Sequence, residues 1–330
     1  ARLPWNENKS WGGLIAFILF GAPATAFMMH WCGVTFPVNV IIGLAIGITI
    51  ICGVVESLPL RINDNLTIAL LGGILIYLSI LTVEKVPYFF AEKVTPLMLW
   101  GGFCLNLGGA LVGYFLRSLS GPAIAAAAII GTALLVFQPW GWGLLVIFFI
   151  IGSAITKISL RFRGDLSPVW SIPTKRGAAQ VLGKGLVPAV FAFLAACTEM
   201  QVLFQLAMVA TIAAALADTV ESEIGQWLGR KPFLPTTSEP ADPGTPGAVS
   251  LEGTLAGLLS AALIIVVASL FGIISLDRFP VILIASFAGT FLESCIGSSE
   301  RWKRVFGGTG LNLIATTVAG LTAIGLNVLL

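Results

Sequence analysis

Three carboxylates directly follow a long apolar stretch of the chain. Residues 202–217 contain no charged side chain, and Asp218, Glu221 and Glu223 come immediately after them, followed by Gly225. On a helix Asp218 and Glu221 share one face, whereas Glu223 points about 140° away and is expected to face solvent or a basic loop. Two carboxylates on one face can hold Mg²⁺ while substrate phosphates complete its coordination. The pattern predicts a metal–phosphate site in which Gly225 leaves room for a ligand. A solvated acidic helix end is the alternative interpretation.

A glycine-rich turn lies a short distance further along the chain. Pro243-Gly244-Thr245-Pro246-Gly247 offers two positions for a positive φ, and Val249-Ser250-Leu251-Glu252 has the pattern of a helix N-cap. Backbone N–H groups in such a turn and at a helix N-terminus bind phosphate oxygens. The turn therefore predicts a phosphate cradle, although a simple turn before a membrane helix has the same features. The P-loop pattern does not occur in the chain.

One short segment supplies the basic residues that an anionic substrate requires. Lys175 and Arg176 precede an apolar stretch, and Gln180 lies one helical turn beyond Arg176. Arg176 can hold a phosphate through two parallel hydrogen bonds. Alternatively, the segment only orients the chain in a membrane. His30 is the only histidine, which disfavours serine-triad hydrolase and zinc-protease chemistry.

These candidate residues belong to a chain with the composition of an integral membrane protein. Of its 330 residues 57% are apolar and 10% are charged, and the mean hydropathy is +0.98. Soluble domains carry about 25% charged residues, so we expect an all-α, polytopic membrane helical bundle. The net charge of +2 and the lack of a basic stripe with aromatic residues argue against nucleic-acid binding. The five cysteines have no metal-ligand spacing and are expected to be reduced structural thiols.

About eleven segments are apolar and long enough, or nearly so, to cross a membrane. They lie at residues 11–31, 36–55, 66–82, 94–116, 122–138, 140–156, 186–198, 202–217, 253–275, 279–293 and 309–329. The segment at 186–198 is short and is expected to be re-entrant or broken at Pro188. Between nine and thirteen spans are therefore compatible with the sequence.

The distribution of basic residues predicts the orientation of these segments. If they alternate in direction, one side of the membrane receives 15 of the 18 Lys and Arg residues, and the other receives Lys85, Lys93 and Arg278. The richer side is expected to be cytoplasmic, which places the N-terminus in the cytoplasm and the C-terminus across a plasma or thylakoid-type membrane. The acids, the glycine turn and the basic segment all fall on the cytoplasmic side. Residues 1–9 are polar and show no signal peptide.

Taken together and in order, these stretches resemble the phytyl-phosphate kinase family of tocopherol biosynthesis, which includes transmembrane protein 19-like proteins. The resemblance covers residues 94–330, through the segments 118–121, 140–143, 175–182, 217–225, 243–254, 292–297 and 310–312. Three positions depart from the family's pattern. Glu293 stands where typical members have aspartate, Ala248 where they have glycine, and Lys184 where many have asparagine.

Residues 1–93 resemble a different group, the phytol and dolichol kinases. The similar stretches are 3–13, which contains Lys9-Ser10 and Gly13, together with 54–60 and 63–67. The resemblance implies a partial phytol/dolichol kinase-like region at 1–93, ahead of a phytyl-phosphate kinase-like domain at 94–330. It also suggests two successive phosphorylations in phytol salvage, first of an isoprenoid alcohol and then of its monophosphate.

The resemblance implies that a phosphoryl group passes from a nucleoside triphosphate, CTP, to a membrane-held isoprenyl monophosphate such as phytyl phosphate, with Mg²⁺ as cofactor. Because the acceptor is already an anion, positioning and charge neutralisation matter more than a general base. The residues expected to carry the chemistry are Asp218, Glu221, Lys175 and Arg176. The expected metal ligands are Asp218, Glu221, Glu223 and Glu293. The residues expected to contact the nucleotide are Gln180, Lys184, Gly244, Thr245, Gly247, Ser250, Thr254 and Asn312.

Two other functions are compatible with the same residues. A cation- or proton-coupled transporter would use Asp218 and Glu221 as its ion site, although transporters place such acids near mid-membrane and often show paired repeats. No convincing repeat is found in the sequence. A CTP-dependent lipid cytidylyltransferase would release pyrophosphate and form a CDP-lipid.

Overall fold

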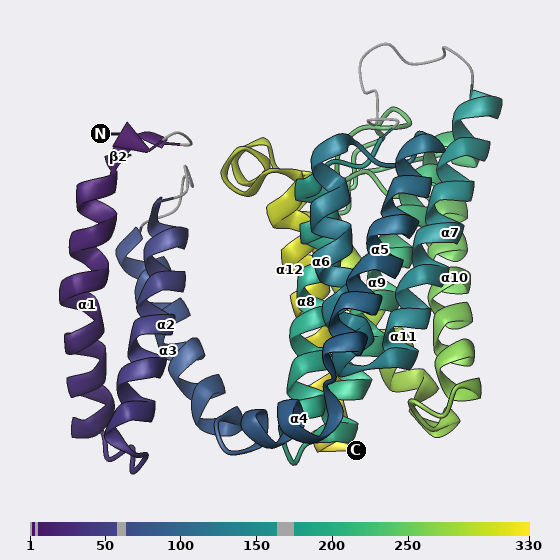
Figure 1. Ribbon diagram of the computed structural model, residues 1–330. Coiled ribbons are helices and arrows are strands. Elements are labelled where there is room, and N and C mark those ends of the chain that lie inside the picture. Colours follow the sequence, from purple (N-terminus) through teal and green to yellow (C-terminus); the bar gives the residue numbers. More distant parts are fainter. Residues whose placement is uncertain (1, 4–5, 58–63, 164–174) are drawn as a thin grey trace. The chain divides into compact units, whose positions relative to one another are not determined.

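The computed structural model describes residues 2–3, 6–57, 64–163 and 175–330. The chain divides into two compact units, Ala1–Tyr88 and Phe89–Leu330. Most of the described residues are helical (Figure 1), which confirms the expected all-α polytopic bundle. The kinase-like identities assigned to residues 1–93 and 94–330 stay predictions.

The elements follow one another along the chain, and the connection from α9 to α10 is a long loop at residues 229–250. In the first unit they are β1 (Arg2–Leu3), β2 (Asn6–Ser10), α1 (Trp11–Trp31), α2 (Val38–Ser57) and α3 (Asp64–Thr82), and α4 (Lys85–Lys93) spans the boundary between the units. In the second unit they are α5 (Pro96–Phe115), α6 (Gly121–Phe137), α7 (Pro139–Arg163), α8 (Ala178–Cys197), α9 (Gln201–Leu228), α10 (Leu251–Leu270), the 3₁₀ turn η1 (Leu276–Arg278), α11 (Phe279–Gly297) and α12 (Glu300–Leu329).

Each of the eleven apolar segments of the sequence falls in a helix. Nine of the described helices are long and apolar enough to span a membrane, and the bent pair α3–α4 makes a tenth if it is one span. The remaining helix, α6, has 17 residues, at the lower limit for a span. The expectation of a short or broken segment at 186–198 is wrong, because α8 begins at Ala178 and continues through Pro188.

The first unit is built from a hairpin and three helices. β1 and β2 pair antiparallel, and the Ser10 hydroxyl accepts a hydrogen bond from the Gly13 N–H and so caps α1. The Lys9 ammonium pairs with the Glu56 carboxylate of α2. The Lys9-Ser10 and Gly13 positions quoted for the kinase resemblance therefore have structural roles in this unit.

The second unit is organised around α9. Helices α7, α8, α10, α11 and α12 all pack against it, and its alanine-rich segment from Ala213 to Ala217 is buried. The apolar stretch ends at residue 217, and α9 continues to Leu228, so Asp218 and Glu221 lie on one helix as the sequence predicted. The acidic residues therefore lie on the last third of the central helix, where the surrounding helices can enclose them.

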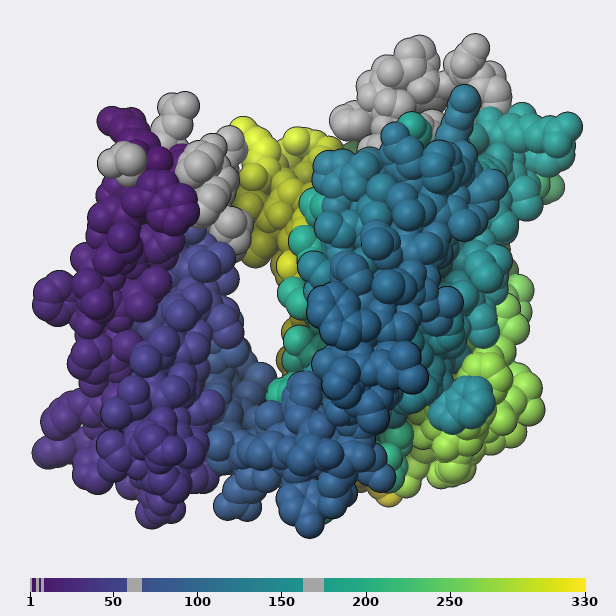
Figure 2. Space-filling view, viewed as in Figure 1, coloured from purple at the N-terminus to yellow at the C-terminus, as the bar shows by residue number. Residues whose placement is uncertain are grey.

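Large apolar side chains cover the outside of the second unit. On α5, Leu97, Trp100 and Phe115 are each more than two thirds exposed. Figure 2 shows this face, on which the blue residues of α5 lie outermost. Exposed apolar residues on this scale would be unusual on a water-soluble protein but suit a helix surrounded by lipid.

The connections of the second unit that hold the candidate residues lie at one end of the bundle. Figure 1 shows residues 116–120, the loop 229–250 and the start of α12 at the upper end, whereas η1 and the C-terminus lie at the lower end. The end with the candidate residues is also the end rich in Lys and Arg. Its assignment to the cytoplasm stays a prediction.

Candidate functional site

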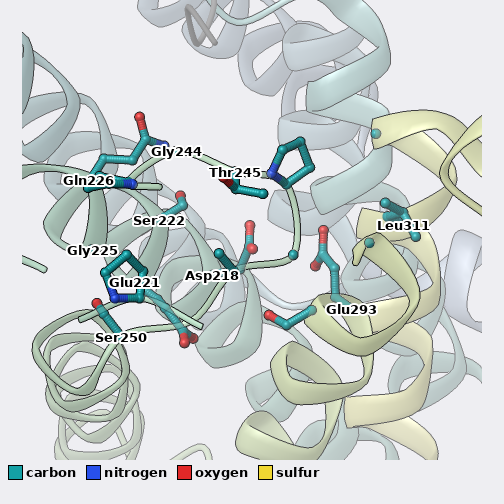
Figure 3. A pocket seen from close by; sticks show the side chains of 18 of the residues that line it. Asp218, Glu221, Ser222, Gly225, Gln226, Gly244, Thr245, Ser250, Glu293 and Leu311 are labelled. Atoms are coloured by element: carbon teal, nitrogen blue, oxygen red, sulfur yellow. The ribbon is translucent and has the colours of Figure 1, made fainter. Parts of the chain in front are cut away.

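A polar cavity of about 320 Å³ lies at the upper end of the second unit. Three acidic residues line it: Asp218 and Glu221 from α9, and Glu293 from α11. The glycine-rich loop forms another wall through Gly244 to Ala248, and Ser250 completes it at the start of α10. Figure 3 shows the carboxylates of Asp218 and Glu293 on the side of the cavity that faces Thr245. The sequence-predicted acids and the predicted phosphate cradle therefore meet.

Close packing of α9 on α10 fixes the position of Glu221. A Cβ atom on Gly253 would lie 2.7 Å from the Glu221 carbonyl oxygen, so only glycine permits this approach. The Thr254 hydroxyl then reaches Glu221 and donates to its Oε1 at 2.7 Å. Gly225 serves the same packing, since a Cβ there would lie 3.2 Å from Ser250 Oγ. Gly225 also lines the polar cavity, and its expected role of leaving room for a ligand stays a prediction.

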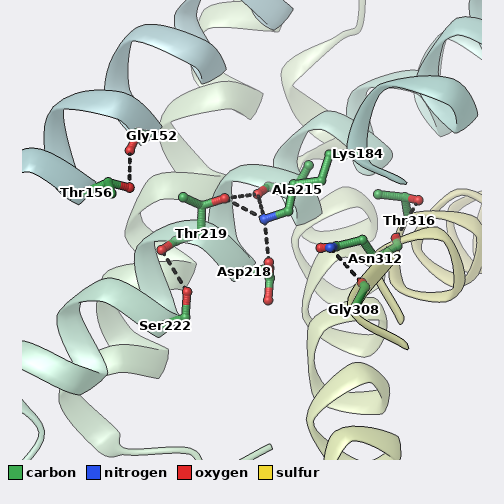
Figure 4. A network of polar contacts seen from close by, with 10 residues as sticks. All are labelled: Gly152, Thr156, Lys184, Ala215, Asp218, Thr219, Ser222, Gly308, Asn312 and Thr316. Atoms are coloured by element: carbon green, nitrogen blue, oxygen red, sulfur yellow. Dashed lines mark hydrogen bonds and ion pairs between the residues drawn. The ribbon is translucent and has the colours of Figure 1, made fainter. Parts of the chain in front are cut away.

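Asp218 is held by a lysine from the neighbouring helix. The Lys184 ammonium donates to Asp218 Oδ2 at 2.5 Å and to Thr219 Oγ1 at 2.6 Å (Figure 4). The Thr219 hydroxyl donates in turn to the Ala215 carbonyl at 2.9 Å. The Lys184 and Asp218 side chains are 15% and 26% exposed, so water screens this pair only partly. Lys184 thus neutralises one edge of Asp218.

Glu293 supplies a carboxylate with unmet hydrogen-bonding capacity. Its Oε2 atom is buried and has no hydrogen-bond partner among the described residues. The carboxylate lies close enough to Asp218, Glu221 and Lys184 for their charges to act on it. A buried oxygen of this kind is costly unless a ligand, a water molecule or a proton satisfies it. Glu293 is therefore a candidate ligand-binding group.

The glycine loop is anchored beside Glu293 on the end of α11. Gly247 has φ 77°, and a Cβ atom there would lie 2.2 Å from the Ser298 nitrogen and 2.6 Å from the Ser294 carbonyl oxygen. The N–H groups of Thr245 and Ala248 are already hydrogen-bonded within the loop, at 3.0 Å each. Those of Gly244 and Gly247 have no partner among the described residues. Two backbone donors therefore remain for an anion.

Ser250 begins α10 as the sequence predicted. Its hydroxyl accepts from the Gly253 N–H at 3.2 Å, and its backbone is extended, as at an N-cap. Because the hydroxyl is committed to the cap, Ser250 offers the cavity only a remaining lone pair and its hydrogen.

A second, larger cavity of about 620 Å³ lies beside the polar one. Apolar residues of α5, α6 and α7 form most of its wall, and Arg176, Lys184 and Glu223 lie at its polar end. Four residues line both cavities: Asp218, Ser222, Glu293 and Gly308. The two cavities therefore meet at the acidic residues.

Arg176 is fixed at the polar end of this second cavity. Its N–H donates to the Ser118 carbonyl at 2.9 Å, and its guanidinium carbon lies 5.2 Å from the centre of the Phe148 ring. Burial lowers the pKa of the guanidinium below its ordinary value, while the charges of Glu223 and Asp218 oppose this shift. The group stays a cation at neutral pH. Its Nη2 atom is buried near Gly152 of α7 and has no hydrogen-bond partner among the described residues, so its hydrogen-bonding capacity is unmet.

Glu223 lies away from solvent. It is 2% exposed and lines the apolar cavity rather than the polar one, near enough to Arg176 for the two charges to attract. The sequence predicted that Glu223 faces either solvent or the basic segment, and the structure places it beside Arg176 of the basic segment. Its Oε2 atom, like that of Glu293, has no partner among the described residues.

The remaining predicted residues divide by location. Gln180 and Asn312 line the apolar cavity, where the Gln180 side chain accepts from the Gly177 N–H at 3.2 Å and the Asn312 amide donates to the Gly308 carbonyl at 2.9 Å. Thr254 lines neither cavity and acts through Glu221. Lys175 is exposed and lines neither cavity. The structure therefore does not bring Lys175 to the acids.

The donor set fits a metal that is shared with phosphate. Within residues 6–57, 64–163 and 175–330, no three His, Cys, Asp or Glu side chains form a cluster that could hold a metal ion alone. The four predicted ligands thus do not form one cage. Mg²⁺ in phosphoryl-transfer sites is typically held by one or two carboxylates, with water and substrate phosphates completing its shell. The unpartnered oxygen of Glu293 and the adjacent Asp218 match that requirement.

Sequence reasoning missed Lys303 as a site residue. Lys303 lines the polar cavity from the start of α12, which is interrupted at Gly307 (φ 61°, ψ 176°). In the sequence Lys303 served only as one of the basic residues that predict orientation. The helix-breaking pair Gly307-Gly308, between two segments of the family resemblance, was the signal that this turn belongs to the site.

A family model described as "Integral membrane protein DUF92" matches residues 104–304. The chain belongs to this family. The matched region contains both cavities except for a few residues of α12, and it lies within the second unit.

Three relatives show how widely this membrane family occurs. The membrane protein MJ0933 of Methanocaldococcus jannaschii is 32% identical over 212 residues, which are 63% of this chain and 85% of the relative. Protein VTE6, chloroplastic, of Arabidopsis thaliana is 34% identical over 195 residues, 57% of this chain and 58% of the relative. The membrane protein sll0875 of Synechocystis is 33% identical over 199 residues, 58% of this chain and 77% of the relative. The chain thus matches little more than half the length of VTE6. No solved structure matches the chain.

Proposed function

We propose that this protein is a Mg²⁺-dependent phosphotransferase that converts an isoprenyl monophosphate, such as phytyl phosphate, into the diphosphate. One observation carries the proposal: Asp218 and Glu293 line both a polar cavity with a glycine loop and an apolar cavity within a membrane bundle. A phosphorylated lipid and a nucleotide can therefore approach the same carboxylates from two sides. The resemblance to phytyl-phosphate kinases and the similarity to a chloroplastic protein support the isoprenoid acceptor.

The polar cavity is the proposed donor site. Asp218 and Glu293 would hold Mg²⁺, which neutralises charge on the donor phosphates when bound, and Glu221 would act from the same wall of the cavity. The free N–H groups of Gly244 and Gly247 would bind phosphate oxygens, and the Lys303 ammonium would add positive charge. The resemblance favours CTP as the donor.

Three residues position this machinery. Thr254 orients Glu221 through its hydrogen bond of 2.7 Å, and Lys184 orients Asp218 through its ion pair. Arg176 would bind the acceptor phosphate where the cavities meet, with Glu223 holding the guanidinium in place by its charge. Lys175 stays a predicted charge-neutralising residue, although its exposed position lies outside both cavities.

The proposed reaction balances without a general base. An oxygen of the acceptor phosphate attacks the terminal phosphorus of the donor, and a new P–O–P linkage forms. The bond between that phosphorus and the bridging oxygen breaks, and the nucleoside diphosphate leaves with the electron pair. Because the attacking oxygen is already anionic, the residues need only align the two phosphates and neutralise their charge.

A product analysis tests the proposal. Purified protein is incubated with Mg²⁺, CTP or ATP, and phytyl or geranylgeranyl monophosphate, and the lipids and nucleotides are then resolved. The proposal expects a lipid diphosphate together with a nucleoside diphosphate. A CDP-lipid with pyrophosphate would instead identify a cytidylyltransferase. Absence of any lipid product, combined with ion-driven solute uptake into vesicles, would identify a transporter.

A further inference from the structure

The apolar cavity has the dimensions and chemistry of a site for a single lipid chain. Its wall along α7 runs from Trp142 to Lys157, a distance of about 22 Å at ~1.5 Å per helical residue. Leu105, Ala110 and Val112 of α5 face the same space. The charged residues of its lining lie toward the end near Arg176 and Lys184, so one end of the cavity is polar and the rest is mostly apolar.

The cavity is open to the lipid-facing side of the second unit. Helix α5 packs closely on α6 but shares few close backbone contacts with α7. Four residues that line the cavity from α7, α5 and the residue directly after α5 are more than half exposed: Leu105, Val112, Leu116 and Ile150. These exposed apolar residues would let the cavity receive a chain from the surrounding lipid.

The polar end of the cavity selects an anionic head group. Arg176 offers a donor, Nη2, that has no partner among the described residues, and Lys184 lies beside it in the lining. The residues shared with the polar cavity lie at this same end. A phosphate placed there would be adjacent to the proposed donor site, with its chain directed along α7.

A polar pair closes the opposite end. The Trp142 indole N–H donates to Asn106 Oδ1 at 2.8 Å, and the Asn106 amide donates to the Gly102 carbonyl at 2.8 Å. Gly131 makes space for this arrangement, because a Cβ atom there would lie 2.1 Å from Asn106 Oδ1. Three helices thus fix the pair, and its hydrogen bonds are satisfied within the protein.

Resting on the proposed function, we infer that this cavity holds the isoprenoid chain of the acceptor phosphate and that the Trp142–Asn106 pair sets the longest chain accepted. To extend past the indole, a longer isoprenoid chain has to break the Trp142–Asn106 hydrogen bond and displace the Trp142 ring. One methylene too many in an apolar pocket changes kcat/KM by about 10-fold or more. The acceptor profile should therefore fall sharply beyond one chain length.

Two variants change the cavity in opposite directions, and each has a matched control. Trp142→Ala removes the closing ring, whereas Trp140→Ala removes an exposed tryptophan that packs against Phe271 and lines neither cavity. Gly109→Leu fills the cavity, because a Cβ atom at Gly109 meets open space. Gly108→Leu is its control, since Gly108 also has open space at Cβ but does not line the cavity.

The first measurement is binding without nucleotide. The full chain is photolabelled with geranylgeranyl monophosphate carrying a terminal diazirine, and the labelled residues are identified by mass spectrometry. We expect labels on α5 and α7 near the Trp142 end, and at least about tenfold less labelling in Gly109→Leu than in Gly108→Leu. Labels found only outside the cavity, or equal labelling of the two glycine variants, would overturn the inference whether or not the protein is a kinase.

The second measurement is kcat/KM for a series of isoprenyl monophosphates of increasing length. Trp142→Ala should raise the relative rate for the first rejected length by about tenfold or more, and Trp140→Ala should leave the profile unchanged. Turnover with an unaltered profile in both Trp142→Ala and Gly109→Leu would refute the chain site but leave the proposed reaction intact. If no acceptor turns over, the proposed reaction fails, and the photolabelling alone decides the chain site. Because Gly109→Leu removes no packing, the test does not depend on Trp142→Ala folding.

Discussion

Replacing Asp218 by asparagine separates the chemical role of this residue from its structural one. The side chain keeps its shape, and its amide oxygen can still accept a hydrogen bond from Lys184. Lys184 also keeps its hydrogen bond of 2.6 Å to Thr219. Asp218→Asn therefore removes mainly a charge, in a position where a neutral side chain can be accommodated.

The stability cost of this change is small. The asparagine oxygen still accepts a charge-assisted hydrogen bond from the Lys184 ammonium, so the change loses only part of an interaction that contributes about 1.5–3 kcal/mol in full. The loss is about 1 kcal/mol, and it is reduced further because Asp218 is about one quarter exposed. For a unit of this size, that loss lowers the melting temperature by roughly 2–4 °C. The variant should therefore fold.

The cost in turnover is much larger. If Asp218 stabilises the charge on the transferred group through Mg²⁺, its loss should lower kcat by about 10²–10³-fold, which corresponds to ~2.7–4 kcal/mol. The assay compares Mg²⁺-dependent lipid diphosphate formation with the melting temperature of the purified protein. Asp277→Asn is the matched control, because Asp277 is 65% exposed and, within the described part of the chain, pairs with Arg278 at the other end of the unit. Wild-type turnover in Asp218→Asn would remove this residue from the mechanism.

Three further changes test other parts of the site. Gly247→Ala should weaken nucleotide binding at least about tenfold, because its Cβ would overlap the end of α11. Gly272→Ala is the control, because Gly272 has a similar φ of 68° but open space at the position of a Cβ atom, so only a backbone cost of about 1–2 kcal/mol is expected. Equal nucleotide affinity in the two variants would contradict the phosphate cradle. Arg176→Gln should raise the KM for the lipid acceptor by about tenfold or more, unlike Arg301→Gln at an exposed position. A cysteine introduced into the loop 229–250 should react with a membrane-impermeant thiol reagent only from the cytoplasmic side, and reaction from the other side would reverse the predicted orientation.

The membrane class and the helices could be predicted from the sequence because both depend on local composition. An apolar run of about 20 residues has few stable alternatives to a spanning helix, so the segments at 11–31 and 279–293 appear nearly as predicted. The ends of helices could be predicted less well where polar residues are buried by other helices, because burial by distant segments is not visible in the local sequence. Residues 218–228, predicted as the acidic end of a span, continue α9 to Leu228, where α10 packs against the helix.

The candidate site was predictable as a set of residues but not as an arrangement. Asp218, Glu221, Gly247 and Ser250 were identified by residue type and spacing, and the structure places all four around one cavity. The partners of these residues come from distant parts of the chain. Neither the ion pair of Lys184 with Asp218 nor the contribution of Lys303 can be derived from spacing along the sequence.

The sequence by itself determined that this protein is an α-helical membrane bundle with carboxylates and a glycine turn at one end, because hydrophobicity and turn propensity act over short distances. Only the tertiary structure decided which carboxylate faces which cavity. Glu223 and Glu221 are two residues apart, yet they line different cavities because successive helical positions point about 100° apart and meet different neighbouring helices. The meeting of a polar and an apolar cavity at Asp218 and Glu293 likewise exists only once α9 and α11 are packed together.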